Sequence, residues 1–117
     1  MNVKVFTAIP TGYSGQLIEV EGTTNKGIPS FNLVGMGDKT ILESKERVRS
    51  AIMNSDFSFP KHKIVINLAP ADLIKSGSSL DLPIAINILI LAKQLREDDI
   101  KDLFFTGELS LDGSLKP

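Results

Sequence analysis

Apolar and polar residues alternate in the first part of the chain, which is the pattern of half-buried β-strands. Residues 2–9 place Val3 and Val5 on one face of such a strand, and residues 16–21 repeat the alternation. The segment between them, residues 10–15, contains Pro, Gly, Thr and Ser, which favour turns. The pattern therefore predicts an antiparallel hairpin at the start of the chain.

A helical period replaces the alternation over residues 38–55. Apolar side chains recur there along one stripe, whereas the charged side chains fall on the remaining surface. The stripe consists of Ile41, Val48, Ala51 and Ile52. This segment is predicted to be an amphipathic helix that lies on a sheet.

The central stretch of the chain combines a short strand with a strongly apolar helix. Residues 64–68 are rich in β-branched side chains and predict a strand that Pro70 ends. Over residues 84–91 only Asn87 is polar, and a helix that is apolar on all sides must be buried on most of them. We interpret it as a core helix laid across the sheet. The alternative is that one face of residues 84–95 docks on a partner outside the chain.

Both predicted helices carry capping signals. Thr40 and Glu43 have the spacing of a capping box in the first helix, and Asp38 is a rival N-cap. Ser78 and Asp81 have the same spacing in the second, where Asp81 could instead be the N-cap itself. Either arrangement would bond free N–H groups of the first helical turn.

The remaining segments are short. Residues 22–29 are predicted to form a polar loop, residues 30–36 a third strand, residues 96–101 a charged turn and residues 103–109 a final strand. The predicted order is β-β-β-α-β-α-β, an α+β fold with helices packed on a mixed β-sheet. We expect residues 1–117 to form a single domain cut from a longer polypeptide.

Composition narrows the function classes. The chain has 117 residues and a net charge of −1, from 13 basic and 14 acidic side chains. This balance argues against a dedicated nucleic-acid-binding protein, which usually has a large basic excess. No cysteine is present, which excludes disulfides and thiolate sites and fits a reducing cytoplasm. The first residues lack the features of a signal peptide, so we expect a cytoplasmic protein without a membrane segment.

Nucleotide and metal sites find little support in the sequence. The segment over residues 35–40 lies between a strand and a helix, but it lacks the G-x-x-x-x-G-K-[ST] pattern, and Asp38 would repel phosphate. Its two glycines instead predict a tight strand-to-helix turn. His62 is the one histidine and stands between Lys61 and Lys63, which disfavour a bound cation. We predict no metal site and no cofactor in this chain.

Ser79 is the candidate nucleophile. It lies in a Gly-Ser-Ser loop before a helix, where backbone N–H groups can stabilise an oxyanion. A serine without a histidine can use a lysine as its base, and Lys39, Lys75 and Lys116 are the candidates. The favoured interpretation is that Ser78 and Ser79 cap the following helix. No catalytic residue is otherwise expected.

Arg47 and Arg49, with Lys45, could share part of the surface of the first helix and contact DNA. Glu43 and Glu46 are interleaved with them, which is typical of a solvated, ion-paired helix face. DNA contact by Arg47 and Arg49 is therefore a hypothesis, and the solvated face is the competing interpretation.

Specific strings of residues occur in order along nearly the whole chain. They are KGIP at 26–29, LVGM at 33–36, ERVRSAI at 46–52, INLAPADL at 66–73, DLPIA at 81–85 and GEL at 107–109. Together they resemble the N-terminal domain of the ComM/YifB family, the magnesium-chelatase-like AAA+ proteins. The resemblance implies a ribosomal protein S5 domain 2-like fold, which is shared with the protease domain of Lon.

The resemblance also implies how such a domain works. In the family it precedes an ATPase module, so ATP and Mg²⁺ are expected to bind that module and not this chain. Its partners would be that AAA+ module, other copies in a homo-oligomeric hexameric ring, and DNA. The implied function is a non-catalytic accessory domain that supports ring assembly or DNA engagement during branch migration and competence.

The likeness to Lon leaves alternatives open. Residues 75–79 resemble the K-D-G-P-S loop of Lon and place Ser79 on the nucleophile, but Lys116 comes before the position that matches the Lon lysine. Leu80 and Asp81 also replace the small residues that follow the serine in Lon. The alternatives to the accessory domain are therefore a Lon-like serine peptidase that uses Ser79 and an independent DNA-binding module.

Overall fold

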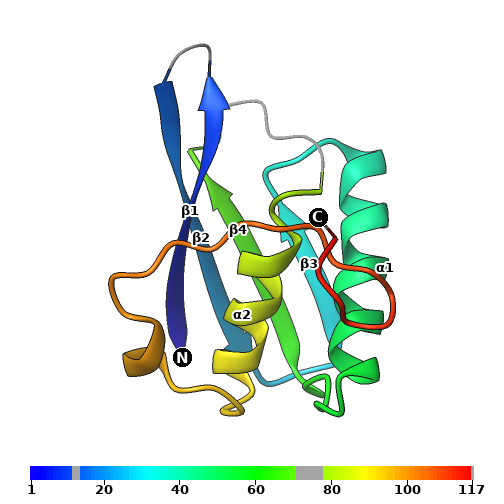
Figure 1. Ribbon diagram of the computed structural model, residues 1–117. Coiled ribbons are helices and arrows are strands. Elements are labelled where there is room, and N and C mark those ends of the chain that lie inside the picture. Colours follow the sequence, from blue (N-terminus) through cyan, green and yellow to red (C-terminus); the bar gives the residue numbers. More distant parts are fainter. Residues whose placement is uncertain (12–13, 71–77, 117) are drawn as a thin grey trace.

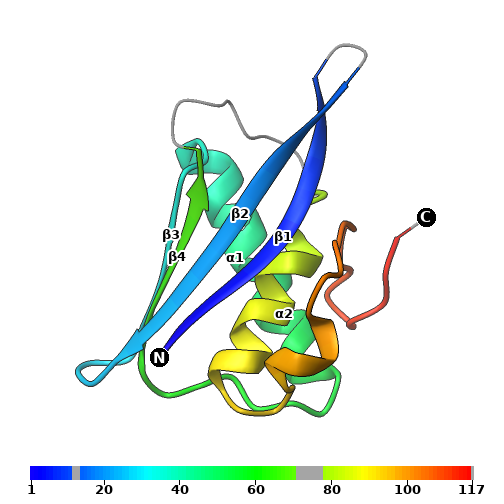
Figure 2. The same ribbon diagram turned by 90° about the vertical axis from the view of Figure 1, so that its left-hand side faces the viewer.

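A four-stranded mixed β-sheet with both α-helices on one face is the framework of the computed structural model (Figures 1 and 2). The structure describes residues 1–11, 14–70 and 78–116. Its elements are β1 (Asn2–Thr11), β2 (Ser14–Asn25), β3 (Ser30–Val34), α1 (Asp38–Asn54), β4 (Lys63–Ala69), α2 (Asp81–Leu91) and a short 3-10 helix η1 (Glu97–Ile100). The predicted α+β class with a mixed sheet is confirmed.

The sheet has the strand order β1-β2-β4-β3. β2 is antiparallel to β1 and to β4, whereas β3 is parallel to β4. The predicted hairpin is therefore confirmed, and β1 and β3 are the edge strands. The loop predicted over residues 22–29 is wrong in its first part, because β2 continues to Asn25, where Asn25 pairs with Lys63. β2 lies between β1 and β4, and its backbone forms hydrogen bonds with both. The polar side chains that begin at residue 22 therefore do not end the strand.

The core lies between the sheet and the two helices. Alternate strand residues point into it, and both helices add their apolar stripes. Its fully buried aliphatic side chains are Val3, Val5, Ile18, Val20, Val48, Ile64, Ile66, Leu68, Leu80, Ile84, Ile88 and Ile90. Burial of an aliphatic side chain of this size contributes about 1.5–3 kcal/mol, so this cluster is the main source of stability.

α2 is a core helix, as predicted. Ile84, Ile88 and Leu91 are buried, and the partly buried Ile86 and Leu89 pack against the same core. The sequence suggested surplus apolar surface on this helix, and the structure uses that surface internally. No helix in the described ranges has the length and apolar character needed to cross a membrane.

Asn87, the one polar residue in the centre of α2, binds the sheet directly. Its side-chain amide is fully buried and donates to the carbonyl oxygens of Val3, at 3.0 Å, and Val20, at 2.9 Å. One residue on each of two paired strands is thus held by one helix residue. Gly22 makes room for this contact, since a Cβ at Gly22 would lie 2.0 Å from the Asn87 side-chain oxygen.

The predicted strand over residues 103–109 is wrong. Phe104 forms one isolated parallel bridge with Phe6, and the Phe105 N–H donates to the Phe6 carbonyl at 3.1 Å. Gly107 then adopts a positive φ of 159°. Its N–H donates to the Ser79 carbonyl at 2.9 Å, and its carbonyl accepts from the Leu82 N–H at 3.1 Å, so it does not pair with a strand. The apolar run follows the edge of β1 for only one bridge.

Candidate functional site

A buried ion pair joins the middle of α1 to the first residue of α2. The Arg47 Nε lies 2.6 Å from the Asp81 Oδ2, and the Arg47 Nη2 lies 3.1 Å from Oδ1. The Ser44 hydroxyl donates to Oδ1 at 2.8 Å, and the Leu109 backbone N–H donates to Oδ2 at 3.2 Å. The carboxylate, which has no exposed surface, therefore accepts four hydrogen bonds, as a buried charge requires.

Both capping predictions for α2 are wrong for this reason. Its N-cap is Leu80, without a side-chain cap, because Asp81 turns inward to Arg47 and Ser44. Ser78 and Ser79 do not cap the helix either. The capping box predicted for α1 is also wrong, since its N-cap is Gly37, again without a side-chain hydrogen bond.

A polar hollow of about 510 Å³ lies beside this ion pair. It is lined by Lys39, Thr40, Glu43, Arg47, Ser78 and Glu108. Glu108 accepts hydrogen bonds from the Ser78 hydroxyl and from the Lys116 Nζ, the latter at 2.9 Å. Arg47 also lies 3.9 Å from Glu43, one helical turn away. Arg47, Glu43 and Glu108 are thus paired with charged side chains, whereas Lys39 forms no ion pair among the described residues.

The electrostatics of the hollow do not favour proton transfer at neutral pH. Hydrogen bonds from Ser78 and then Lys116 hold the pKa of Glu108 below its ordinary value. The hydrogen bond to Asp81 raises the pKa of Arg47, against the opposing effect of burial, so the guanidinium stays charged. A general base works best with a pKa near the working pH, so Glu108 is a poor base for Ser78.

Ser79 is half-buried in the turn before α2, and its carbonyl holds this turn in place. The oxygen accepts hydrogen bonds from the Gly107 N–H, at 2.9 Å, and the Thr106 hydroxyl, at 3.4 Å. Within residues 1–11, 14–70 and 78–116, no hydrogen bond joins the Ser79 hydroxyl to a lysine. Lys75 lies outside the described residues. Reactivity of Ser79 stays a prediction.

The segment between β3 and α1 is a tight turn, as the glycines predicted. Gly35 has a φ of 113°, and a Cβ there would lie 2.6 Å from the Leu68 carbonyl oxygen. Gly37 has ordinary backbone angles and open space around it, so only Gly35 needs to be a glycine. Asp38 occupies the first turn of α1.

Neither Arg49 nor His62 lines the polar hollow. The guanidinium of Arg49 is exposed and lies 5.0 Å from the centre of the Phe59 ring, whereas Arg47 is engaged with Asp81. The two arginines therefore have separate surroundings, and DNA contact by either stays a prediction. His62 is exposed, and in the part of the chain that the structure describes no three His, Asp or Glu side chains gather to hold a metal ion.

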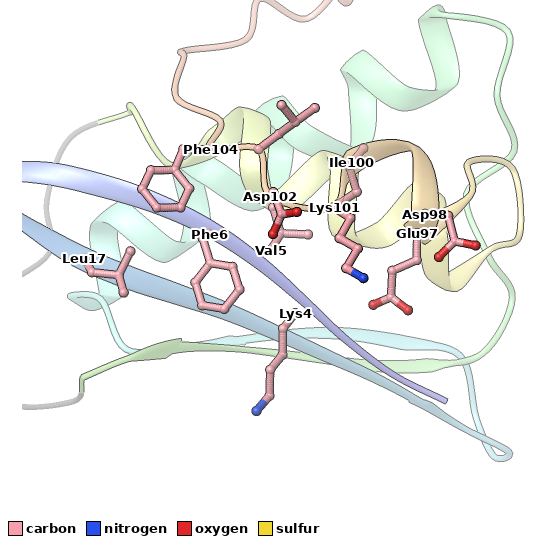
Figure 3. A pocket seen from close by; sticks show the side chains of 11 residues that line it. Lys4, Val5, Phe6, Leu17, Glu97, Asp98, Ile100, Lys101, Asp102 and Phe104 are labelled. Carbon is pink, nitrogen blue, oxygen red and sulfur yellow. The ribbon is translucent and has the colours of Figure 1, made fainter.

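An apolar hollow of about 540 Å³ opens between the β1 edge and the segment over residues 97–104. Its apolar lining consists of Val5, Phe6, Leu17, Ile100, Leu103 and Phe104. Figure 3 shows Phe6, Leu17 and Phe104 at one end and the charged Glu97, Asp98 and Lys101 at the other. Phe104 is 65% exposed and Leu103 is 50% exposed, so the hollow presents apolar surface to solvent.

Neither the buried ion pair nor the apolar hollow was predicted from the sequence. Arg47 and Asp81 are 34 positions apart, so no local spacing connects them. The available signal was a carboxylate at the first position of a helix whose only other polar residue is Asn87. The apolar hollow went unrecognised because its Phe104 side was taken for a strand.

Comparisons with known proteins agree with the order of motifs. Residues 20–117 match the family model described as subunit ChlI of Mg-chelatase. The chain is 44% identical over 112 residues to the competence protein ComM of Haemophilus influenzae and, equally, to the uncharacterized protein YifB of Escherichia coli. An uncharacterized protein of Mycobacterium tuberculosis is 33% identical over 114 residues, which is 97% of this chain and 23% of that relative.

These relatives are much longer than the chain. The match to ComM and to YifB covers 96% of this chain but 22% of each relative. The matched part is the N-terminal part of those proteins. The chain therefore spans about a fifth of the length of the curated relatives that it matches.

Proposed function

The chain belongs to the family of subunit ChlI of Mg-chelatase, and we propose that it is a non-catalytic N-terminal accessory domain of a AAA+ ATPase. In this proposal the ATPase module of the same polypeptide binds ATP and Mg²⁺. The domain supports assembly of the ATPase into a homo-oligomeric ring and helps the ring to engage DNA. The protein acts in the cytoplasm, which fits a sequence without cysteine.

The state of the polar hollow supports a non-catalytic role. Arg47 binds Asp81 with two hydrogen bonds, and Glu108 binds Ser78 and Lys116. Arg47 and Glu108 are thus engaged with other side chains and are not available to bind a phosphate or to activate a nucleophile, and Lys39 is the one lining cation without an ion pair among the described residues. Asp38 in the first turn of α1 adds a negative charge where a nucleotide phosphate would otherwise be attracted.

The proposal that the domain docks on the ATPase module rests on the apolar hollow. Phe6, Leu103 and Phe104 form an apolar floor beside an edge strand, with charged side chains at one end. Aromatic side chains in a concave apolar site with a polar rim are typical of a protein interface. Its proposed occupant is the ATPase module of the same polypeptide, because the relatives continue for most of their length beyond the matched part.

Size-exclusion chromatography with light scattering tests the docking role in the longer protein, in the presence of ATP and Mg²⁺. Changing Leu103 and Phe104 together to Ser is expected to shift the ring toward smaller species. Leu42→Ser is the matched control, since Leu42 is 68% exposed on α1 and outside the hollow. Rings of normal size in the double variant, or equal loss in the control, would contradict the docking role.

Calorimetric titration of the 117-residue chain with ATP and Mg²⁺ tests the non-catalytic role. We expect no saturable binding, because the chain offers no phosphate-binding loop and its hollow is internally neutralised. Saturable binding in the micromolar range would contradict the proposal. This experiment does not depend on the oligomeric state.

A further inference from the structure

One end of the molecule gathers cationic side chains around aromatic rings. The loop after α1, the start of β4 and the end of α2 lie together there (Figure 1). We call this surface the basic end and define it as Lys45, Arg49, Phe59, Lys61, His62 and Lys93. A shallow hollow of about 540 Å³, lined in part by Phe59, Lys61, His62 and Lys93, lies at its centre.

The basic end is a fixed surface. Gln94, after α2, clamps the loop after α1, because its side chain accepts from the Ser58 N–H at 2.8 Å and donates to the Ser58 carbonyl at 2.7 Å. The His62 carbonyl accepts from the Ser30 N–H at 3.3 Å. Phe59 packs against Phe31, with 5.5 Å between the ring centres. These contacts fix the backbone that carries the charges.

The cationic side chains of the basic end have no carboxylate partners among the described residues. Among the described residues, Lys45, Arg49, Lys61 and Lys93 form no ion pair, unlike Arg47 with its buried partner Asp81. No basic residue occupies the last turn of α1 or of α2. These cations are therefore not positioned to interact with the negative end of either helix dipole. The hollow of the basic end is lined by Lys61, His62 and Lys93 and by no carboxylate, although the whole chain has a net charge of −1.

Two of the cations lie over aromatic rings. The Arg49 guanidinium is 5.0 Å from the centre of the Phe59 ring, and the Lys45 Nζ is 5.6 Å from the centre of the Phe31 ring. Arg49 is exposed, so its guanidinium can contact a ligand as well as the Phe59 ring. A planar guanidinium can stack on an unpaired base while lysines contact the phosphates on either side.

We infer that the basic end binds single-stranded nucleic acid, with Lys45, Lys61 and Lys93 at the phosphates and the Arg49–Phe59 pair under a base. This site replaces the pair Arg47 and Arg49 that the sequence suggested, because Arg47 is held by Asp81. The inference rests on the DNA-engagement part of the proposed function and is independent of the apolar hollow.

Fluorescence anisotropy of the chain with a labelled oligothymidylate of about 20 nucleotides tests the site. Binding is expected to weaken steeply with salt, since each phosphate contact on a single strand adds about −0.7 to the slope of log K against log salt. Lys61→Gln with Lys93→Gln should weaken binding at least about tenfold at 50 mM salt and reduce that slope by about 1.4. Arg49→Lys keeps the positive charge but removes the planar guanidinium, and it should also weaken binding.

Lys39→Gln with Lys101→Gln is the matched control, because it removes the same charge away from the basic end. Equal weakening in the control, unchanged affinity in the Lys61 and Lys93 variant, or tighter binding to a duplex of the same length would overturn the site. If the unmodified chain does not bind the strand at all, DNA engagement by this domain fails together with the site. Circular dichroism verifies that each variant is folded.

Discussion

Arg47 and Asp81 meet through two parallel nitrogen–oxygen contacts of 2.6 and 3.1 Å, although 34 positions separate them in the sequence. The pair ties α1 to the start of α2 at a point where the carboxylate has no access to water. Leu109, from the C-terminal segment, donates its backbone N–H to the same carboxylate. One buried charge thus holds three parts of the chain together.

Removing one partner of this pair is expected to be costly. Arg47→Met leaves Asp81 buried without its cation and should lower the free energy of unfolding by about 3–5 kcal/mol. Urea denaturation measures the change. Arg49→Met is the control, since Arg49 is exposed, and it should cost less than about 1 kcal/mol. Equal losses in the two variants would contradict the structural role of the pair.

Gly22 should not tolerate a methyl group. Gly22→Ala forces the Asn87 amide away from the sheet, because the new Cβ would lie 2.0 Å from its oxygen. The expected cost is about 1–3 kcal/mol, measured as a lower thermal midpoint. Gly15→Ala on the same strand is the matched control, since the nearest atom to a Cβ there is 3.9 Å away. A Gly22→Ala protein as stable as the control would refute the close contact.

Glu108 should make the protein sensitive to acid. Its pKa is lowered in the folded state by the hydrogen bonds from Ser78 and Lys116, from an ordinary value of 4.5. Its contribution to stability is therefore present above pH 4.5 and is lost as the pH falls through the lower folded-state pKa. Thermal midpoints measured between neutral and acidic pH should fall less steeply for Glu108→Gln than for the unmodified chain.

Glu46→Gln serves as the control for this pH experiment, because it removes one negative charge from the exposed surface of α1. Its midpoints should follow those of the unmodified chain. If Glu108→Gln also follows the unmodified chain down to acidic pH, the contacts of Glu108 with Ser78 and Lys116 do not contribute to stability.

Ser79 is expected to be unreactive. A serine nucleophile needs a base within reach, and in the described ranges no lysine bonds its hydroxyl. A fluorophosphonate probe should label the chain and its Ser79→Ala variant equally weakly, as measured by intact mass. Ser78→Ala is the control for labelling at the neighbouring hydroxyl. Stoichiometric labelling that only Ser79→Ala abolishes would instead favour the serine peptidase alternative.

Local periodicity was enough to predict most of the fold. The β1–β2 hairpin, α1 and the core helix α2 were predicted because each carries its own pattern of apolar positions. The conformation of the C-terminal segment was not predicted. An apolar run such as residues 103–109 indicates that the segment is buried or paired, but it does not indicate which part of the chain it contacts. There the hydrogen bonds with Ser79 and Leu82 decided the conformation.

The candidate site was less predictable from the sequence than the fold. Arg47, Ser78 and Asp81 were all singled out as polar groups near helices, but each was assigned a local role. Long-range partners decided those roles, namely Asp81 for Arg47 and Glu108 for Ser78. Arg49 was placed correctly on an exposed surface, but its contact with the Phe59 ring depends on the loop after α1.

The hold of Asn87 on Val3 has a consequence for biosynthesis. The two residues are 84 positions apart, so a ribosome adding 5–20 residues per second needs about 4 to 17 s to make the second after the first. Throughout that interval the helix that covers the apolar face of β1 is still unmade. The apolar face of the first strand therefore stays without its native cover until α2 has been synthesised.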